Sequence, residues 1–158
     1  MTMILDGSAG VTFPNSTVQA SSGVVLQVVQ GTASTTVSTT SVPFVTTGLT
    51  ATITPKFSNS KIFVSISLPC QNGSNASTAL FTIYRNSTNL VSTGVNAFCQ
   101  TYFSASTGYT NVPLIYLDSP ATTSATAYTA YMSAYVGQTV TAMQNNVVGT
   151  ITLMEIAG

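Results

Sequence analysis

The chain has 158 residues, of which only 4% are charged, whereas globular proteins average about 25%. Its three cations and three carboxylates sum to a net charge of zero. Three cations are too few to neutralise the phosphates along a nucleic acid, which excludes a nucleic-acid-binding surface. The chain also lacks histidine, the commonest general base and metal ligand, so we predict no metal and no cofactor.

Residues 1–22 differ in pattern from the rest of the chain. Turn-forming residues dominate at 6–10 and 15–17, and the segment is too short and too polar to fold alone. We predict an N-terminal attachment arm anchored by Phe13 and Val18. The chain start has no signal-peptide pattern, and no segment approaches the roughly 20 apolar residues that span a bilayer, so no membrane insertion is expected.

From residue 23 onward, short strand patterns recur at spacings of about ten residues, with turn residues between them. The clearest is 61–68, where every second residue is apolar and would face a core. The other expected strands cover 24–30, 49–54, 78–85, 98–104, 112–117, 122–136, 139–143 and 147–156. Residues 32–40 are polar and β-branched, which fits either an edge strand or a loop.

The segment 122–136 admits two interpretations. Ser119 and Pro120 suit the start of a helix, and its tyrosines recur at helical spacing. Its many threonines, and the absence of any charge on a would-be polar face, favour a strand instead. The chain is therefore predicted to fold as an all-β protein. We expect an antiparallel β-sandwich, or jelly-roll head, over residues 23–158, in an order that the sequence does not determine.

The last predicted strand has two apolar faces. Ile151 and Leu153 share one face and would pack into the sandwich. Met154 and Ile156 share the other, which needs a cover, and a second copy of the chain would supply it. We predict a subunit interface at Met154 and Ile156. Alternation also turns Glu155 toward the core, where it needs a cation.

Few residues could support catalysis. Asp118 and Glu155 are conceivable as the carboxylate pair of a glycosidase. The alternative gives both structural roles, with Asp118 capping its own turn and Glu155 paired with a cation, namely Lys56, Lys61 or Arg85. The structural alternative is favoured, so we predict a non-enzymatic protein.

Two cysteines, Cys70 and Cys99, match no metal-ligand spacing. They fit either a disulfide or two half-buried thiols that pack as small apolar groups, and the second interpretation is favoured.

Binding is a better prospect than catalysis. Tyrosine rings can stack on sugar rings while amide side chains bind the hydroxyls. The candidate contacts to a glycan are Tyr102, Tyr109, Tyr131 and Tyr135. Half-buried strand positions are the competing explanation for each of them. Ligand contacts are expected in loops 71–77 and 104–111.

A series of short motifs spans nearly the whole chain in a characteristic order. They are Gly10-Val-Thr-Phe-Pro-Asn-Ser-Thr-Val-Gln19, Val25-Leu-Gln-Val-Val-Gln30, Thr47-Gly-Leu-Thr-Ala51 with Ile53-Thr-Pro55, Ser60-Lys-Ile62, Tyr84-Arg-Asn-Ser-Thr-Asn-Leu90 and Gly149-Thr-Ile-Thr-Leu-Met-Glu-Ile-Ala157. In this order they resemble the tail-fibre and virion-surface proteins of bacteriophages, especially of cyanophages and other aquatic phages.

The resemblance implies a structural protein on the surface of a phage particle, built as a homotrimer of jelly-roll subunits. We expect a tail-fibre-type module for host attachment, joined through its arm to other tail or capsid proteins. Such modules bind host surface glycans, so the resemblance implies a host surface glycan as the partner of the candidate tyrosines. The alternative is a capsid decoration or head-fibre protein that coats or stabilises the shell.

Overall fold

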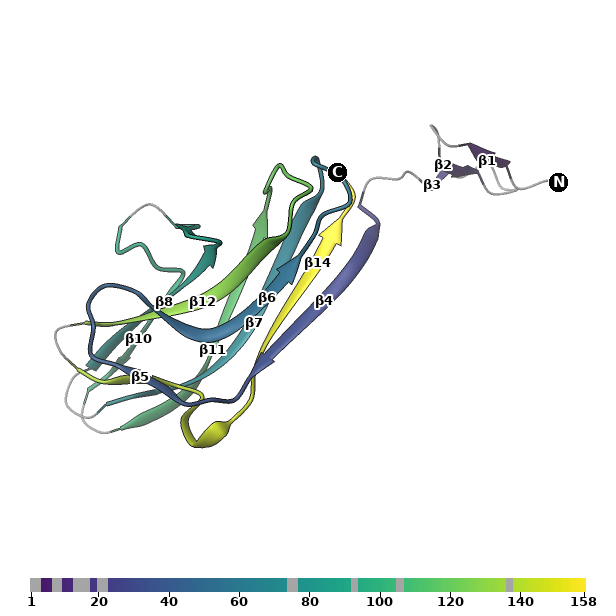
Figure 1. Ribbon diagram of the computed structural model, residues 1–158. Helices are drawn as coiled ribbons and strands as arrows, with labels where there is room; N and C mark the ends of the chain where they lie inside the picture. Colours follow the sequence, from purple (N-terminus) through teal and green to yellow (C-terminus); the bar gives the residue numbers. More distant parts are fainter. Residues whose placement is uncertain are drawn as a thin grey trace.

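The computed structural model describes residues 4–6, 10–12, 18–19, 23–73, 77–91, 94–104, 107–135 and 138–158. Within these ranges the chain is almost entirely strand, and its single helical element is the short turn η1 (Gln144–Asn146). Two antiparallel sheets pack face to face around one core (Figure 1). The predicted all-β antiparallel sandwich is confirmed.

The first sheet has four long strands side by side. Their order is β4 (Val25–Ala33), β14 (Gly149–Ile156), β7 (Lys61–Asn72) and β11 (Gly108–Asp118). Beyond the start of β14, the end of β7 pairs with β13 (Val140–Ala142), which in turn pairs with β5 (Val37–Thr39).

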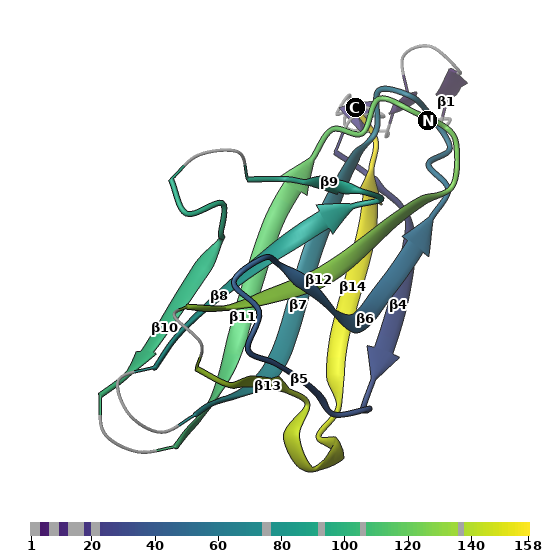
Figure 2. The same cartoon turned by 60° about the vertical axis from the view of Figure 1, so that its left-hand side comes forward.

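The second sheet also has four main strands, which lie in front of the first sheet in Figure 2. Their order is β6 (Val45–Ile53), β12 (Thr126–Tyr135), β8 (Ser77–Arg85) and β10 (Cys99–Phe103). The last residues of β8 form a hairpin with β9 (Thr88–Asn89).

The strand order is that of a jelly roll. When the eight main strands are numbered along the chain, the first sheet runs first, eighth, third, sixth and the second runs second, seventh, fourth, fifth. This interleaving places two Greek keys across the two sheets. The last strand therefore lies inside the first sheet, between β4 and β7, instead of at an edge.

Alternation along the strands explains the core. On β7, Ile62, Val64, Ile66 and Leu68 are each at most 2% exposed, as the sequence pattern predicted. The helical alternative for 122–136 is wrong, because 126–135 form β12, whose inward face fills the centre of the second sheet. That inward face carries Tyr128, Ala130, Met132 and Ala134, all fully buried.

β7 and β11 extend further than the sequence indicated. They pair without interruption from Ile62 with Asp118 to Asn72 with Gly108. The predicted loops 71–77 and 104–111 are accordingly shorter, since residues 71–72 and 108–111 are strand. The backbone ladder accepts polar side chains that face outward, and the buried Asn72 amide has hydrogen-bond partners in Ser77 and Thr101, so polarity alone misplaced these ends.

The arm contains a small sheet of its own. β1 (Ile4–Asp6), β2 (Gly10–Thr12) and β3 (Val18–Gln19) pair antiparallel and lie apart from the sandwich in Figure 1. Val18 lies in β3, and Phe13 falls outside the described residues. The sandwich begins where Gly23 donates a backbone hydrogen bond to Ala157, so the arm joins it beside the C-terminal residues.

Candidate functional site

The outer face of the first sheet carries an apolar row that crosses its four main strands. The register places Val28 beside Met154, Met154 beside Phe63, and Phe63 beside Leu117. Val28 is 56% and Leu117 is 47% exposed, while Met154 and Phe63 are half-buried. We call these four residues the apolar row. Exposed apolar surface of this kind marks interaction sites.

The apolar row continues toward the C-terminal end of β14. Ile156 lies next to Val25, which is 50% exposed, and on its other side next to Lys61. The structure therefore brings the predicted interface residues, Met154 and Ile156, onto one outer face with apolar residues from β4, β7 and β11. The sequence pattern indicated the outward direction of Met154 and Ile156, but the neighbours depend on strand pairing.

The outer face of the second sheet is different in character. On β6 the outward residues are threonines, and Thr46, Thr50 and Thr52 are exposed. The Thr50 hydroxyl lies 2.8 Å from that of Thr129 on β12, so the two form a hydrogen bond across the strands. The outer side of β6 therefore presents hydroxyls to water, whereas the apolar row of the first sheet presents aliphatic and aromatic groups.

Two of the predicted tyrosines lie together on the second sheet. Tyr102 on β10 and Tyr135 on β12 both pair with Thr78 on β8, one from each side. They share the outer face, two strand spacings or about 10 Å apart. Their exposed fractions are 60% and 54%. Strand order brings them together, although they are far apart in the sequence.

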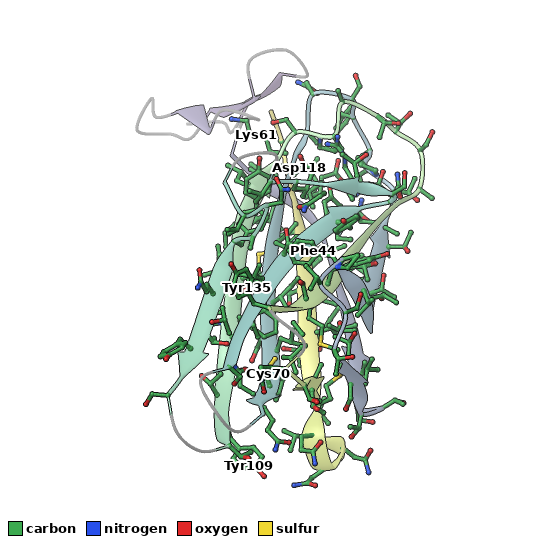
Figure 3. The ribbon with its side chains drawn as sticks, turned by 90° about the vertical axis from the view of Figure 1, so that its left-hand side faces the viewer. Phe44, Lys61, Cys70, Tyr109, Asp118 and Tyr135 are labelled. Carbon is green, nitrogen blue, oxygen red and sulfur yellow. The ribbon has the colours of Figure 1, made fainter. Side chains whose placement is uncertain are left out.

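A shallow pocket of about 410 Å³ lies beside Tyr135. The loop with Val42, Pro43 and Phe44 forms one wall, and Val95 with Asn96 forms another. Phe44 and Tyr135 mark this region in Figure 3. The lining is mainly apolar.

Tyr131 is less exposed than Tyr102 and Tyr135, because it packs against a neighbouring ring. Its ring stacks on that of Tyr84, with the centroids 4.0 Å apart and the planes inclined by 24°. It is half-buried on the outer face of β12. This contact supports the competing explanation, in which Tyr131 is a packed strand residue.

Tyr109 lies on the other sheet, in the larger of the two pockets described. It is 66% exposed and sits near the start of β11, opposite Gln71 on β7. The pocket has a volume of about 520 Å³. We call it the Tyr109 pocket; it is lined by Ser67, Pro69, Cys70, Tyr109, Thr110, Asn111, Gln144 and Val147.

The two carboxylates near the core have structural partners. Asp118 accepts two hydrogen bonds from Nη1 of Arg85, both at 3.0 Å, and a third from the Tyr128 hydroxyl at 2.6 Å. Burial, the hydrogen bond and the charge of Asp118 raise the pKa of Tyr128 well above its ordinary value. The expected turn cap at Asp118 is wrong, because the carboxylate instead ties the two sheets together.

Glu155 is fully buried and has no cation beside its carboxylate among the described ion pairs. Its oxygens accept from Nε2 of Gln27 at 2.6 Å and from the backbone N–H of Lys56 at 2.7 Å. The Lys56 ammonium instead donates to the carbonyl of Leu26. The expected cation partner is wrong: backbone and amide donors replace it, and such donors leave no trace in a charge pattern.

The pKa of Glu155 reflects two opposed effects. Burial raises it, but the Ser60 hydroxyl, Gln27 and the backbone N–H groups of Lys56 and Phe57 together hold it below its usual value. The buried Ser60 hydroxyl makes no hydrogen bond of standard geometry. Its effect on the carboxylate is therefore that of a nearby dipole, and the aligned donors are the other three groups.

The stability of the fold should depend on pH through Glu155. A carboxyl whose pKa is lower in the folded state contributes stability above its ordinary pKa of 4.5, and this contribution is lost as the pH falls through the folded-state pKa. Glu155→Gln should reduce the free energy of unfolding by about 2 kcal/mol at neutral pH, since it removes charge-assisted hydrogen bonds.

Urea unfolding of wild type and of Glu155→Gln, measured from neutral pH to below pH 4.5, tests the prediction. The difference in free energy between wild type and Glu155→Gln should shrink below pH 4.5. Parallel pH profiles, with a constant difference, would show that Glu155 does not titrate as described.

Cys70 and Cys99 are both free thiols. Cys70 is buried beneath the Tyr109 pocket, and burial, with the neighbouring Cys99, raises its pKa well above the ordinary value. Burial also raises the pKa of Cys99. The favoured interpretation, two thiols that pack as small apolar groups, agrees with this arrangement.

Comparison with known proteins does not assign the chain to a family. No protein-family model and no curated protein matches the chain. In the described ranges, no group of three or more Cys, Asp or Glu residues could hold a metal ion. No helix among those residues is long and apolar enough to cross a membrane. The function is therefore argued from the surfaces described above.

Proposed function

We propose that the protein is a non-enzymatic structural component of a phage virion surface that assembles as a homotrimer. The observation that carries the proposal is the apolar row on the outer face of the first sheet, in which Val28 is 56% and Leu117 is 47% exposed. The outward side chains of β6, in the other sheet, are instead threonines. Interface cores are apolar and poor in charge. The apolar row itself contains no charged residue, and Lys61 lies beside Ile156 at its end.

The trimer places the β14 side of each subunit around a common axis. Met154 and Ile156 then face neighbouring copies, together with Val28 and Phe63. The low charge of the chain removes most of the repulsion that would keep identical subunits apart. The resemblance of the ordered sequence motifs to phage surface proteins supports the same assembly.

Host attachment is the favoured role within the virion. Tyr102 and Tyr135 are exposed on the second sheet, away from the proposed interface, where a trimer would present three copies of each. Exposed tyrosines are common in recognition surfaces because they offer contact area with little loss of conformational freedom. Capsid decoration is the alternative role, and both roles use residues 1–22 for attachment to the particle.

Met154→Lys should dissociate the trimer. The substitution places three ammonium groups near one axis, and like charges brought together in an interface cost several kcal/mol. Light scattering at micromolar concentration should report a trimer for wild type and a monomer for the variant. The matched control is Thr52→Lys, which adds the same charge to an exposed position of the second sheet. A monomeric wild type would contradict the proposal.

Particle labelling tests the role in the virion. An antibody against residues 23–158, visualised by electron microscopy on intact phage particles that contain the chain, should label the tail tips. Label over the whole head would instead establish decoration. A chain that purifies away from the particles altogether would overturn both roles.

A further inference from the structure

The Tyr109 pocket is formed by three parts of the chain. Tyr109 and Asn111 come from β11, and Pro69 comes from β7 beside them. Gln144 comes from η1 and Val147 directly follows it, and this segment between β13 and β14 closes the pocket on its third side. Figure 3 places Tyr109 at the end of the sandwich opposite Lys61 and Asp118.

One wall of the pocket is formed by η1 with Met143 before it and Val147 after it, and we call it the η1 wall. Its backbone is held in an unfavourable conformation. Met143, Asn145 and Asn146 have φ of 51°, 59° and 60°, in the left-handed region that L-residues rarely occupy. Met143 is fully buried, and its N–H donates to the carbonyl of Pro69 at 2.8 Å. Such strain persists only where the surroundings impose it. The wall is therefore preorganised, which lowers the entropy lost on binding a ligand.

The polar groups of the pocket are amides and hydroxyls around an exposed ring. Ser67 donates to Oδ1 of Asn111 at 3.0 Å, which orients that side chain and leaves its Nδ2 as a donor. Gln144 provides a second amide, and the ring of Tyr109 provides an apolar surface. An apolar ring flanked by hydrogen-bonding amides suits a sugar, whose pyranose ring has an apolar face and a rim of hydroxyls.

The pocket contains no charge. None of the six charged residues of the chain is among its lining residues. Lys61 pairs with Ile156 ten residues along β7 from Gln71, the partner of Tyr109. That separation is about 30 Å along the strand, several times the Debye length of about 8 Å at physiological salt. A carboxylate or phosphate on the ligand would lose its hydration without a compensating cation.

We infer that the Tyr109 pocket binds a neutral saccharide. The inference rests on the proposed role in host attachment; it names a class of receptor and a binding site separate from the exposed Tyr102 and Tyr135 of the second sheet. The pocket lies about 20 Å along β7 from the apolar row, as judged from the six-position separation of Phe63 and Pro69. Saccharide binding and subunit assembly therefore use separate parts of the first sheet.

Binding of defined oligosaccharides to the full chain tests the inference. The probes are neutral trisaccharides of glucose, mannose and N-acetylglucosamine, with sialyllactose and trigalacturonate as acidic counterparts. Saturation-transfer NMR and titration calorimetry should detect a neutral probe and no acidic one. The affinity should not change between low and high salt, because no charge contributes.

Substitutions locate the site. Tyr109→Ala should weaken binding at least about tenfold, a factor that corresponds to loss of one aromatic contact. Phe57→Ala is the matched control, since it removes an exposed aromatic side chain from the turn before Lys61, outside the pocket, and should leave binding unchanged. Light scattering on each variant separates saccharide binding from assembly, so a trimer that binds no sugar refutes this inference and leaves the proposed assembly standing.

Several results would overturn the inference. They include preference for an acidic probe, loss of binding with Phe57→Ala but not with Tyr109→Ala, and dissociation of the trimer by Tyr109→Ala. No binding of any neutral probe at about 10 mM, ten times a Kd of 1 mM, would overturn it as well.

Discussion

Gly31→Ala is expected to destabilise the fold by about 3 kcal/mol, the upper end of the usual effect of overpacking. Gly31 lies in β4 opposite Ile151 on β14, where the edge of the first sheet approaches β6. A Cβ atom at this position would lie 2.1 Å from the carbonyl oxygen of Thr50 and 3.1 Å from Cγ2 of Ile151. The first neighbour is backbone, so a side-chain rotation cannot relieve the clash.

The backbone around Thr50 cannot easily retreat. β6 is paired with β12 along its length, and the Thr50 hydroxyl donates to the carbonyl of Tyr128 at 3.0 Å. Moving β6 away from β4 would therefore disturb the second sheet as well as the contact between the sheets. The substitution is expected to reduce stability through the packing of both layers.

Urea unfolding at a fixed protein concentration measures the effect, because assembly makes apparent stability depend on concentration. Gly48→Ala is the control. Gly48 has φ of +80° but nothing within 4 Å of the added carbon, so it should lose only the conformational term of about 1 kcal/mol. Equal losses at both positions would mean that the close approach at Gly31 does not matter.

Strand positions could be predicted from the sequence because the buried faces are so regular. Alternation at 61–68 located the central strand of the first sheet, and threonine content correctly favoured a strand at 126–135. Strand order could not be predicted, because pairings such as Val28 with Met154 join segments that are distant in the chain. Backbone ladder hydrogen bonds carry no side-chain signature that would indicate the partner.

The candidate surfaces were predictable only in part. Alternation placed Met154 and Ile156 on the outward face of the last strand, but the contributions of Val28 and Leu117 required the register. Composition indicated the tyrosines, yet Tyr102 and Tyr135 become neighbours only through their shared partner Thr78. The η1 wall of the Tyr109 pocket had no distinguishing pattern beyond the pair Asn145-Asn146, which the sequence indicated as a turn.

Asp118→Ala is expected to cost about 3 kcal/mol, the lower end of the effect of breaking a buried ion pair, because the Arg85 side chain is 29% exposed. Asp118 is 5% exposed and stands at the end of β11 in the first sheet. Arg85 and Tyr128 are paired with each other across β8 and β12 in the second sheet. The carboxylate thus joins the two layers at one end of the sandwich. Its loss leaves the fully buried Tyr128 hydroxyl without its acceptor and Arg85 without its counter-ion.

Tyr128→Phe provides the comparison. It removes one hydrogen bond but leaves the ion pair between Arg85 and Asp118, so it should cost only about 1 kcal/mol. The double variant combines Asp118→Ala with Tyr128→Phe. It has no buried hydroxyl that lacks an acceptor, because the Tyr128 hydroxyl has been removed. The double variant should therefore be less destabilised than the sum of the single variants, with a coupling of about 1–2 kcal/mol by urea unfolding. Simple additivity would show that Asp118 and Tyr128 act independently, and that the tie between the sheets depends on Arg85 alone.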